Sequence, residues 1–277
     1  MNKRIYPLLA VLLGAAGFGL QCRAQTTAFE PLTGLIVPGT ASMLVLKIFF
    51  VAVPVIALLC ALPLKGSGAR IDATGRLFEH LSFPARFVGV LAGMLYCAAA
   101  LLRLTGDVRT GAGLAVLAVD VLLIVGGACM VWQIVTPGSR RSLLTLLPGF
   151  SIAFWLVIYY HTQSKDPIVE RYGALLLCLM ATALALYHQA GWSFGKANPV
   201  RGMTFTLIAG IYAFAAMPAA AGTADLLALT AIGLWMLLHA AVLPGAPEKT
   251  WEDFYTAAQS YAKTHSELSG VENYGFD

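Results

Sequence analysis

The chain has 277 residues, of which 58% are hydrophobic and 12% are charged, and its mean hydropathy is +0.76. A soluble domain carries about 25% charged residues, so this composition excludes a large soluble domain. The net charge of +4 is too small to indicate a nucleic-acid surface, and the recurring apolar runs make the lipid bilayer the expected partner.

Eight apolar stretches are long enough for membrane-spanning helices, and they recur almost to the end of the chain. They predict an all-α, polytopic transmembrane helical bundle with seven or eight spans, in which residues 25–246 form the main body. The expected spans are residues 5–20, 42–64, 83–102, 113–135, 144–161, 169–188, 203–219 and 226–243.

Residues 1–24 allow two interpretations. Lys3 and Arg4 precede a mostly apolar run that ends at Cys22-Arg23-Ala24, a pattern typical of a signal peptide with a small-x-small cleavage site. The same residues also fit a first helix, although the run is short for a complete span. Both interpretations stay open, and they give seven and eight spans respectively.

Lysine and arginine set the expected orientation. With the N-terminus inside, twelve of the 18 Lys and Arg residues fall in inner segments, five in outer loops and one, Lys47, within a span. Positive charge favours the cytoplasmic side, so we expect a cytoplasmic C-terminus. The short basic leader and compact loops suggest a bacterial plasma membrane.

The first outer segment, residues 23–41, carries turn signals at Pro31 and Gly34 and again at Pro38-Gly39. We expect this segment to fold onto the helices as a structural cap, with a ligand lid as the alternative. Pro54 in the next span cannot donate a helical hydrogen bond, which predicts a kink there.

Asp120 is the only carboxylate well inside an apolar span. An aspartate at a helix centre costs about 2.5–3.5 kcal/mol, so this side chain should face the bundle interior and have a partner. Gly113 and Gly127, two turns away on the same face, would let another helix approach closely. Lys47 falls at a similar depth, and either pairs with Asp120 or extends outward to the membrane surface.

The candidate polar site combines Asp120 and Lys47 with Glu30 and His161, which are expected above them at the outer side. The sequence contains no phosphate loop, metal-ligand spacing or cofactor motif, so no cofactor or metal is predicted. The five cysteines are far apart in sequence and are expected to pack as small apolar residues.

Residues 247–277 differ from the rest of the chain and are expected to form a cytoplasmic tail. Aromatic side chains recur there at helical spacing, which predicts an amphipathic helix able to bind a protein partner, followed by an acidic, disordered end. These aromatic residues are Trp251, Phe254, Tyr255 and Tyr261.

Three functions fit these features. The first is a small-solute carrier with an outward-facing site at Asp120, and the second is a non-catalytic scaffold or accessory subunit. The third, a membrane enzyme acting on lipid, is disfavoured because few polar residues gather in the spans and the G-x-S-x-G run around Ser193 follows no strand. Its candidate acid–base residues are His161 with Glu30 or Asp120, and Ser193 with His239.

Overall fold

The structure, a computed structural model, describes residues 5–30, 35–37, 39–65, 81–136, 142–166, 168–193 and 198–245. Within these residues, eight helices are long and apolar enough to cross a membrane. Strand structure in the same residues is limited to one isolated bridge, between Phe29 and Ile36. The predicted all-α, polytopic helical bundle is therefore confirmed.

The helices fall at the predicted positions, and the differences lie at their ends. The two largest differences are at the C-terminal ends of the first and third helices, which continue about two turns beyond residues 20 and 102. Short 3-10 turns follow three helices. In order, the elements are α1 (Ile5–Thr27), α2 (Ala41–Ala61), η1 (Leu62–Lys65), α3 (Phe83–Thr110), α4 (Leu114–Val135), α5 (Ser142–Gln163), α6 (Val169–Ser193), α7 (Pro199–Ala216), η3 (Met217–Ala219), α8 (Thr223–Val242) and η4 (Leu243–Gly245).

Local sequence explains why α3 is so long. Its C-cap, Gly111, has φ 71°, a left-handed conformation that glycine adopts without strain. The Gly111 N–H bonds the Val108 carbonyl, and the Ala112 N–H bonds the Asp107 carbonyl at 2.8 Å. These bonds satisfy the last carbonyls of the helix, so α3 ends at this glycine rather than before Arg103.

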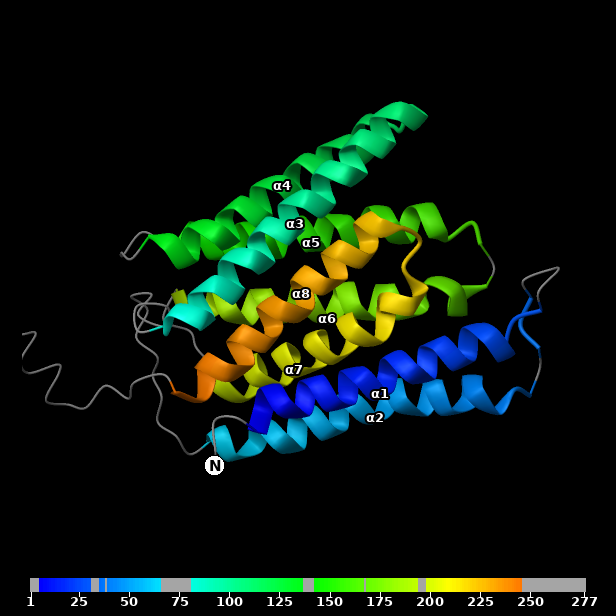
Figure 1. Cartoon of the computed structure of the whole chain (residues 1–277), viewed down its shortest axis with the longest axis horizontal. Helices are drawn as coiled ribbons and strands as arrows, with labels where there is room; N and C mark the ends of the chain where they lie inside the picture. The colour runs from blue at the N-terminus through cyan, green and yellow to red at the C-terminus, as the bar shows by residue number, and fades with distance from the viewer. Residues whose placement is uncertain are drawn as a thin grey trace, which may run out of the picture.

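Six of the helices form a closed ring. Each helix from α3 to α8 packs against the next one in the chain, and α8 packs back against α3. Helices α1 and α2 lie outside this ring and pack against α7 (Figure 1). In the same view, the joined ends of α3 and α4 lie at the corner of the bundle farthest from α1 and α2. We call this the Gly111 end, and the opposite end, where α8 finishes, the Gly245 end.

Glycine allows α3 and α4 to approach each other closely. A Cβ atom on Gly127 would lie 2.6 Å from Cys97 Sγ, and one on Gly93 would lie 2.6 Å from Val131 Cγ2. The predicted close approach at Gly127 is therefore confirmed. A Cβ on Gly113 would meet nothing within 4 Å, so that half of the prediction is wrong.

The start of the segment between α1 and α2 packs against these helices at Ala28 and Phe29, as predicted, whereas Leu35 and Val37 of its apolar run are exposed. The Glu30 N–H bonds the Leu35 carbonyl at 2.8 Å, and the Val37 N–H bonds the Ala28 carbonyl at 2.8 Å. A small apolar cluster below it contains Ala24, Ala28, Met43 and Leu46.

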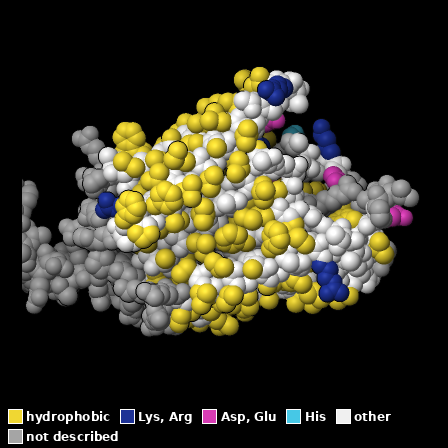
Figure 2. Space-filling view, viewed as in Figure 1, with side chains coloured by type: hydrophobic (Ala, Val, Ile, Leu, Met, Phe, Trp, Pro, Cys, Tyr) yellow, Lys and Arg dark blue, Asp and Glu magenta, His cyan; other side chains and the backbone are white. Residues whose placement is uncertain are grey.

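The surface pattern agrees with immersion in a bilayer. Figure 2 shows hydrophobic side chains across the middle of the visible face, with charged side chains mainly toward the Gly111 end. Large apolar side chains such as Val51, Met94 and Val157 are more than half exposed, which suits contact with lipid. The aromatic residues of the predicted tail helix, Trp251, Phe254, Tyr255 and Tyr261, lie outside the described residues, so that helix stays a prediction.

Candidate functional site

Asp120 lies on α4 with no solvent-exposed surface, and an arginine on α3 neutralises it. Arg103 Nε donates a hydrogen bond to Asp120 Oδ1 at 3.2 Å. The predicted inward orientation of Asp120 is confirmed, and Arg103 is the ion-pair partner that the described residues supply. Arg103 reaches this position only because α3 continues past residue 102.

The same guanidinium also binds a carboxylate from a third helix. Arg103 Nη1 donates to Oδ1 of Asp225 at 3.2 Å, and Asp225 lies in the first turn of α8. The side chains of Arg103 and Asp225 are 17% and 13% exposed, whereas that of Asp120 is fully buried. Charge-assisted bonds of this kind are stronger than neutral ones, so Arg103 joins α3, α4 and α8 firmly.

An aromatic face completes the environment of the guanidinium. Arg103 Cζ lies 4.7 Å from the ring centroid of Trp155 on α5, within the distance of a cation–π interaction. Trp155 is fully buried, and its Nε1 has no hydrogen-bond partner among the described residues. Tyr159, one turn further along α5, lies within electrostatic reach of Arg103 and Asp225.

A third carboxyl group adjoins the pair. Asp107 follows Arg103 by one helical turn on α3, and its carboxyl group lies close enough to that of Asp120 to interact with it. Asp120 Oδ2 is fully buried and has no hydrogen-bond partner in the described part of the chain. We call Arg103, Asp107, Asp120, Trp155 and Asp225 the Arg103 cluster. It contains one guanidinium and three carboxyl groups.

Lys47 belongs to a different ion pair. Lys47 Nζ donates to Glu170 Oε1 at 3.0 Å, which links α2 to α6. The structure therefore does not pair Lys47 with Asp120. The Lys47 side chain is 59% exposed, as the outward alternative predicted. The hydrogen bond from Lys47 lowers the pKa of Glu170, which lies just before the apolar span of α6.

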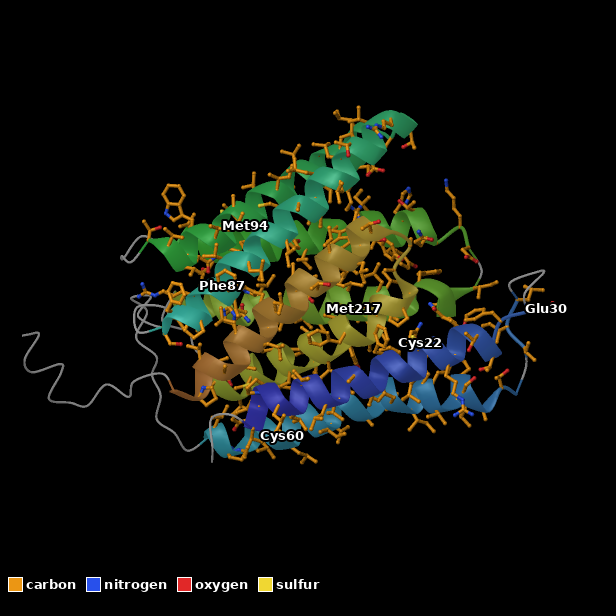
Figure 3. The ribbon with its side chains drawn as sticks, viewed as in Figure 1. Cys22, Glu30, Cys60, Phe87, Met94 and Met217 are labelled. Atoms are coloured by element: carbon orange, nitrogen blue, oxygen red, sulfur yellow. The ribbon has the colours of Figure 1, made fainter. Side chains whose placement is uncertain are left out.

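The structure leaves the other two members of the predicted polar site apart from Asp120. Glu30 is exposed in the loop beyond the ends of α1 and α2 (Figure 3). His161 is exposed in the last turn of α5. Neither side chain forms a hydrogen bond or an ion pair with Asp120.

The second set of enzyme candidates pairs Ser193 with His239, and the structure describes the side chain of His239 alone. The side chain of Ser193 lies outside the described residues. His239 is buried, and its Nδ1 lies 2.9 Å from the Trp235 carbonyl oxygen of its own helix. Across the described ranges, no three His, Cys, Asp or Glu side chains are grouped to hold a metal ion.

Polar groups also occur within the ring toward the Gly245 end. Gln189 Nε2 on α6 donates to Thr206 Oγ1 on α7 at 3.4 Å, and both side chains are buried. Between this layer and the Arg103 cluster, the ring is filled by large side chains. A cavity of about 10 Å³ is left there, and Tyr96, Ile152 and Trp235 are among its lining residues.

Sequence reasoning missed Arg103, Asp107 and Asp225, because each lies just outside a predicted apolar span. Two signals could have found them. Gly111 is a better end for α3 than Arg103, since glycine is the usual residue after a helix. Gly222 likewise marks an earlier start for α8: it is the N-cap, so the helix begins at Thr223 and Asp225 lies in its first turn.

Comparisons with known proteins give no relative: no family model, no curated protein and no solved structure matches this chain. The Arg103 cluster is therefore interpreted from its own chemistry.

Proposed function

We propose that this integral membrane protein is a small-solute carrier, with the ring of α3 to α8 as its transport unit and the Arg103 cluster as its binding site. The observation that carries the proposal is one arginine held by carboxylates from two other helices inside an apolar bundle. Ionisable groups within a membrane are costly, and they commonly mark solute, ion or proton pathways.

The exposure of the cluster supports this function. Asp120 is fully enclosed, whereas Arg103 and Asp225 keep part of their surface at the Gly111 end. A charged solute arriving from that end would meet these two side chains first. Because Arg103 shares its donors between two carboxylates, a solute carboxylate could replace Asp225 without leaving Asp120 unpaired.

The positions of the polar groups along the ring also support the carrier function. The Arg103 cluster lies toward one end, the Gln189–Thr206 layer lies toward the other, and bulky side chains separate them. Carriers bind solute between helix bundles and open to one side at a time. The described conformation corresponds to a closed state in this scheme.

We also infer that the Gly111 end faces outward in a bacterial plasma membrane, with the C-terminus in the cytoplasm. The excess of Lys and Arg in the segments at the other end supports this orientation. A fluorescent protein that matures only in the cytoplasm, fused after Asp277, should fluoresce in a bacterial host. A dark fusion that is present in the membrane at normal amounts would contradict the orientation.

A thermal-shift screen tests the carrier. The purified full chain is heated with each member of a library of small metabolites, and the unfolding midpoint is compared with that of the free protein. A ligand that binds the folded state raises this midpoint. At least one metabolite should stabilise the native protein and fail to stabilise Arg103→Gln or Asp225→Asn.

Arg109→Gln is the matched control, because Arg109 is an exposed arginine in the last turn of the same helix. This variant should keep the full ligand response. The carrier proposal is wrong if no metabolite shifts the native midpoint, or if Arg103→Gln responds as the native protein does.

A second candidate, a non-catalytic scaffold or accessory subunit, is favoured by one observation: Asp120 is fully enclosed and already paired. In that function the cluster only fixes the positions of helices, and the tail binds a protein partner. Buried ion pairs specify structure in some systems. The same screen would then give no response, and removal of residues 249–277 should abolish co-purification of a partner. Unchanged co-purification would exclude the tail from this function.

A further inference from the structure

The two oxygens of Asp120 have different surroundings. Oδ1 accepts a hydrogen bond from Arg103, whereas Oδ2 is fully buried and receives none from the described residues. Besides Arg103, α3 brings a second polar group, the carboxyl of Asp107, into interaction with Asp120. An ionised carboxylate can only accept hydrogen bonds, so two ionised groups here could not bond each other.

The charges of the neighbouring helices do not remove this conflict. Helix α3 contributes Arg103 and Asp107, and α8 contributes Asp225, which takes one of the Arg103 donors. From α5 come Trp155, which is neutral, and Tyr159, whose hydroxyl lies near Asp225. One positive charge therefore neutralises part of the charge of three neighbouring carboxyl groups, and repulsion between neighbouring carboxylates disfavours full ionisation.

We propose that Asp107 and Asp120 hold one proton between them. The protonated carboxyl of one residue donates its O–H to the carboxylate of the other, and this bond satisfies the otherwise unpaired Asp120 Oδ2. The cluster then carries two negative charges and one positive charge. Paired aspartates elsewhere share a proton for the same electrostatic reason.

A proton fits this position, and a larger cation does not. Asp120 has no surface that a water-sized probe can reach, so neither a hydrated ion nor the several oxygen ligands of a bare metal ion have room beside it. Asp107 is partly exposed near the end of α3 and gives the shared proton a route to water at the Gly111 end.

Release of the proton would alter the ion pairs of Arg103. With both carboxyl groups charged, Asp120 and Asp107 together attract the guanidinium more strongly, and the bond from Arg103 to Asp225 weakens. Asp225 is one of the two groups that a solute would meet first in the proposed carrier. The shared proton is thus suited to be the coupling ion of transport, and this role rests on the carrier function proposed above.

Infrared spectroscopy of the purified full chain tests the shared proton. A protonated carboxyl has a carbonyl stretching band that ionised carboxylates lack, and this band should be present at neutral pH. Asp107→Asn and Asp120→Asn should each remove it, because the asparagine amide supplies an N–H donor and the remaining aspartate can ionise. Glu170→Gln removes a carboxylate that pairs with Lys47 outside the Arg103 cluster. It is the control, and it should keep the band at its native frequency.

The proposal is overturned if the native protein lacks the band at neutral pH, or if both asparagine variants keep it at native intensity. Size-exclusion profiles check that the variants fold, and a titration of the band in the native protein alone gives a second measurement. The native band should disappear in a single step as the pH is raised.

The coupling role is tested separately with the same metabolite library. Thermal shifts measured at acidic and alkaline pH should differ for a responding metabolite in the native protein and agree in Asp107→Asn. If no metabolite responds, the carrier function and the coupling role both fail, whereas the infrared band still decides whether the proton is shared.

Discussion

Tyr212 on α7 donates a hydrogen bond from its hydroxyl group to the backbone carbonyl of Phe50 on α2. This carbonyl lies four residues before Pro54, which has no N–H to bond it. The two aromatic rings also meet edge to face, with centroids 5.1 Å apart. Helix α2 continues through Pro54, and the predicted kink stays a prediction. Tyr212 thus supplies the donor that proline removes and fixes α2 to the outside of the ring.

Tyr212→Phe should lower the free energy of unfolding by about 1 kcal/mol, because the ring contact is kept and one buried hydrogen bond is lost. Reversible denaturation of the purified protein measures this change. Tyr160→Phe, at an exposed tyrosine, is the control and should have no effect.

Pro54→Ala provides a stricter version of this test. Alanine restores the N–H that can bond the Phe50 carbonyl, so Tyr212→Phe should cost less in that background than in the native one. If Tyr212→Phe lowers the unfolding free energy equally in both backgrounds, the hydrogen bond from Tyr212 does not compensate for the N–H that Pro54 lacks.

Removal of Arg103 should destabilise the protein more than removal of the charge that it neutralises. Arg103→Met leaves Asp120 buried without its cation and should cost about 3–5 kcal/mol. Asp120→Asn should cost less, because the amide oxygen can still accept the bond from Arg103 Nε. The unfolding free energies of both variants measure the difference.

The double variant Arg103→Met with Asp120→Leu separates charge from packing. It removes both buried charges, so it should recover part of the stability that Arg103→Met loses. A double variant less stable than Arg103→Met alone would show that packing, rather than an unpaired charge, explains the loss.

The spans of this fold were predictable from sequence, because the length and hydropathy of an apolar run are local properties. The Arg103 cluster could not be predicted in the same way, although Asp120 was identified as a candidate. The prediction ended the third span just before Arg103, the first charge after its long apolar run. That arginine can remain inside a membrane helix because Asp120 and Asp225 neutralise it from other helices, and one segment does not reveal this.

The pairing of Lys47 shows a second limit. Depth along a helix suggested Asp120 as one possible partner, but depth does not say where a helix lies around the bundle. Helix α2 packs on α7 outside the ring. Helix α4 lies between α3 and α5, on the side of the ring opposite α7. Lys47 therefore reaches Glu170 on α6. Such lateral positions depend on contacts between distant segments.

The Lys47–Glu170 pair predicts a small, pH-dependent contribution to stability. The folded-state pKa of Glu170 is lowered by the hydrogen bond from Lys47, so the pair stabilises the protein above the ordinary glutamate pKa, about 4.3. The contribution is lost as the pH falls through the lower pKa of the folded state. For a pair this exposed, the expected size is about 0.5 kcal/mol.

Unfolding midpoints of the native protein and of Glu170→Gln, measured from neutral to acidic pH, test this prediction. The difference between them should be constant at neutral pH and shrink in acid. Lys47→Gln should produce the same pattern, and adding Glu170→Gln to it should change nothing further. A difference that persists in acid would rule out ionisation of Glu170 as its cause.

We also expect α1 to be retained as a membrane helix rather than removed as a signal peptide. Its buried face extends to Ala24, and the helix continues to Thr27, past the candidate cleavage site. The intact mass of the protein purified from membranes should therefore include residues 1–24. Loss of these residues from the mature protein would contradict this expectation.

Two matched glycines test whether α1 stabilises the mature protein. A Cβ on Gly17 would lie 2.7 Å from the Ala215 Cβ on α7 and 2.7 Å from the Phe49 ring, whereas one on Gly19 would meet nothing within 4 Å. Gly17→Ala should therefore lower the unfolding free energy by about 1–3 kcal/mol, the usual cost of overpacking. Gly19→Ala makes the same chemical change in the same helix and should be neutral or slightly stabilising. If α1 is absent from the mature protein, neither substitution can change its stability, so equal midpoints would favour the signal-peptide interpretation.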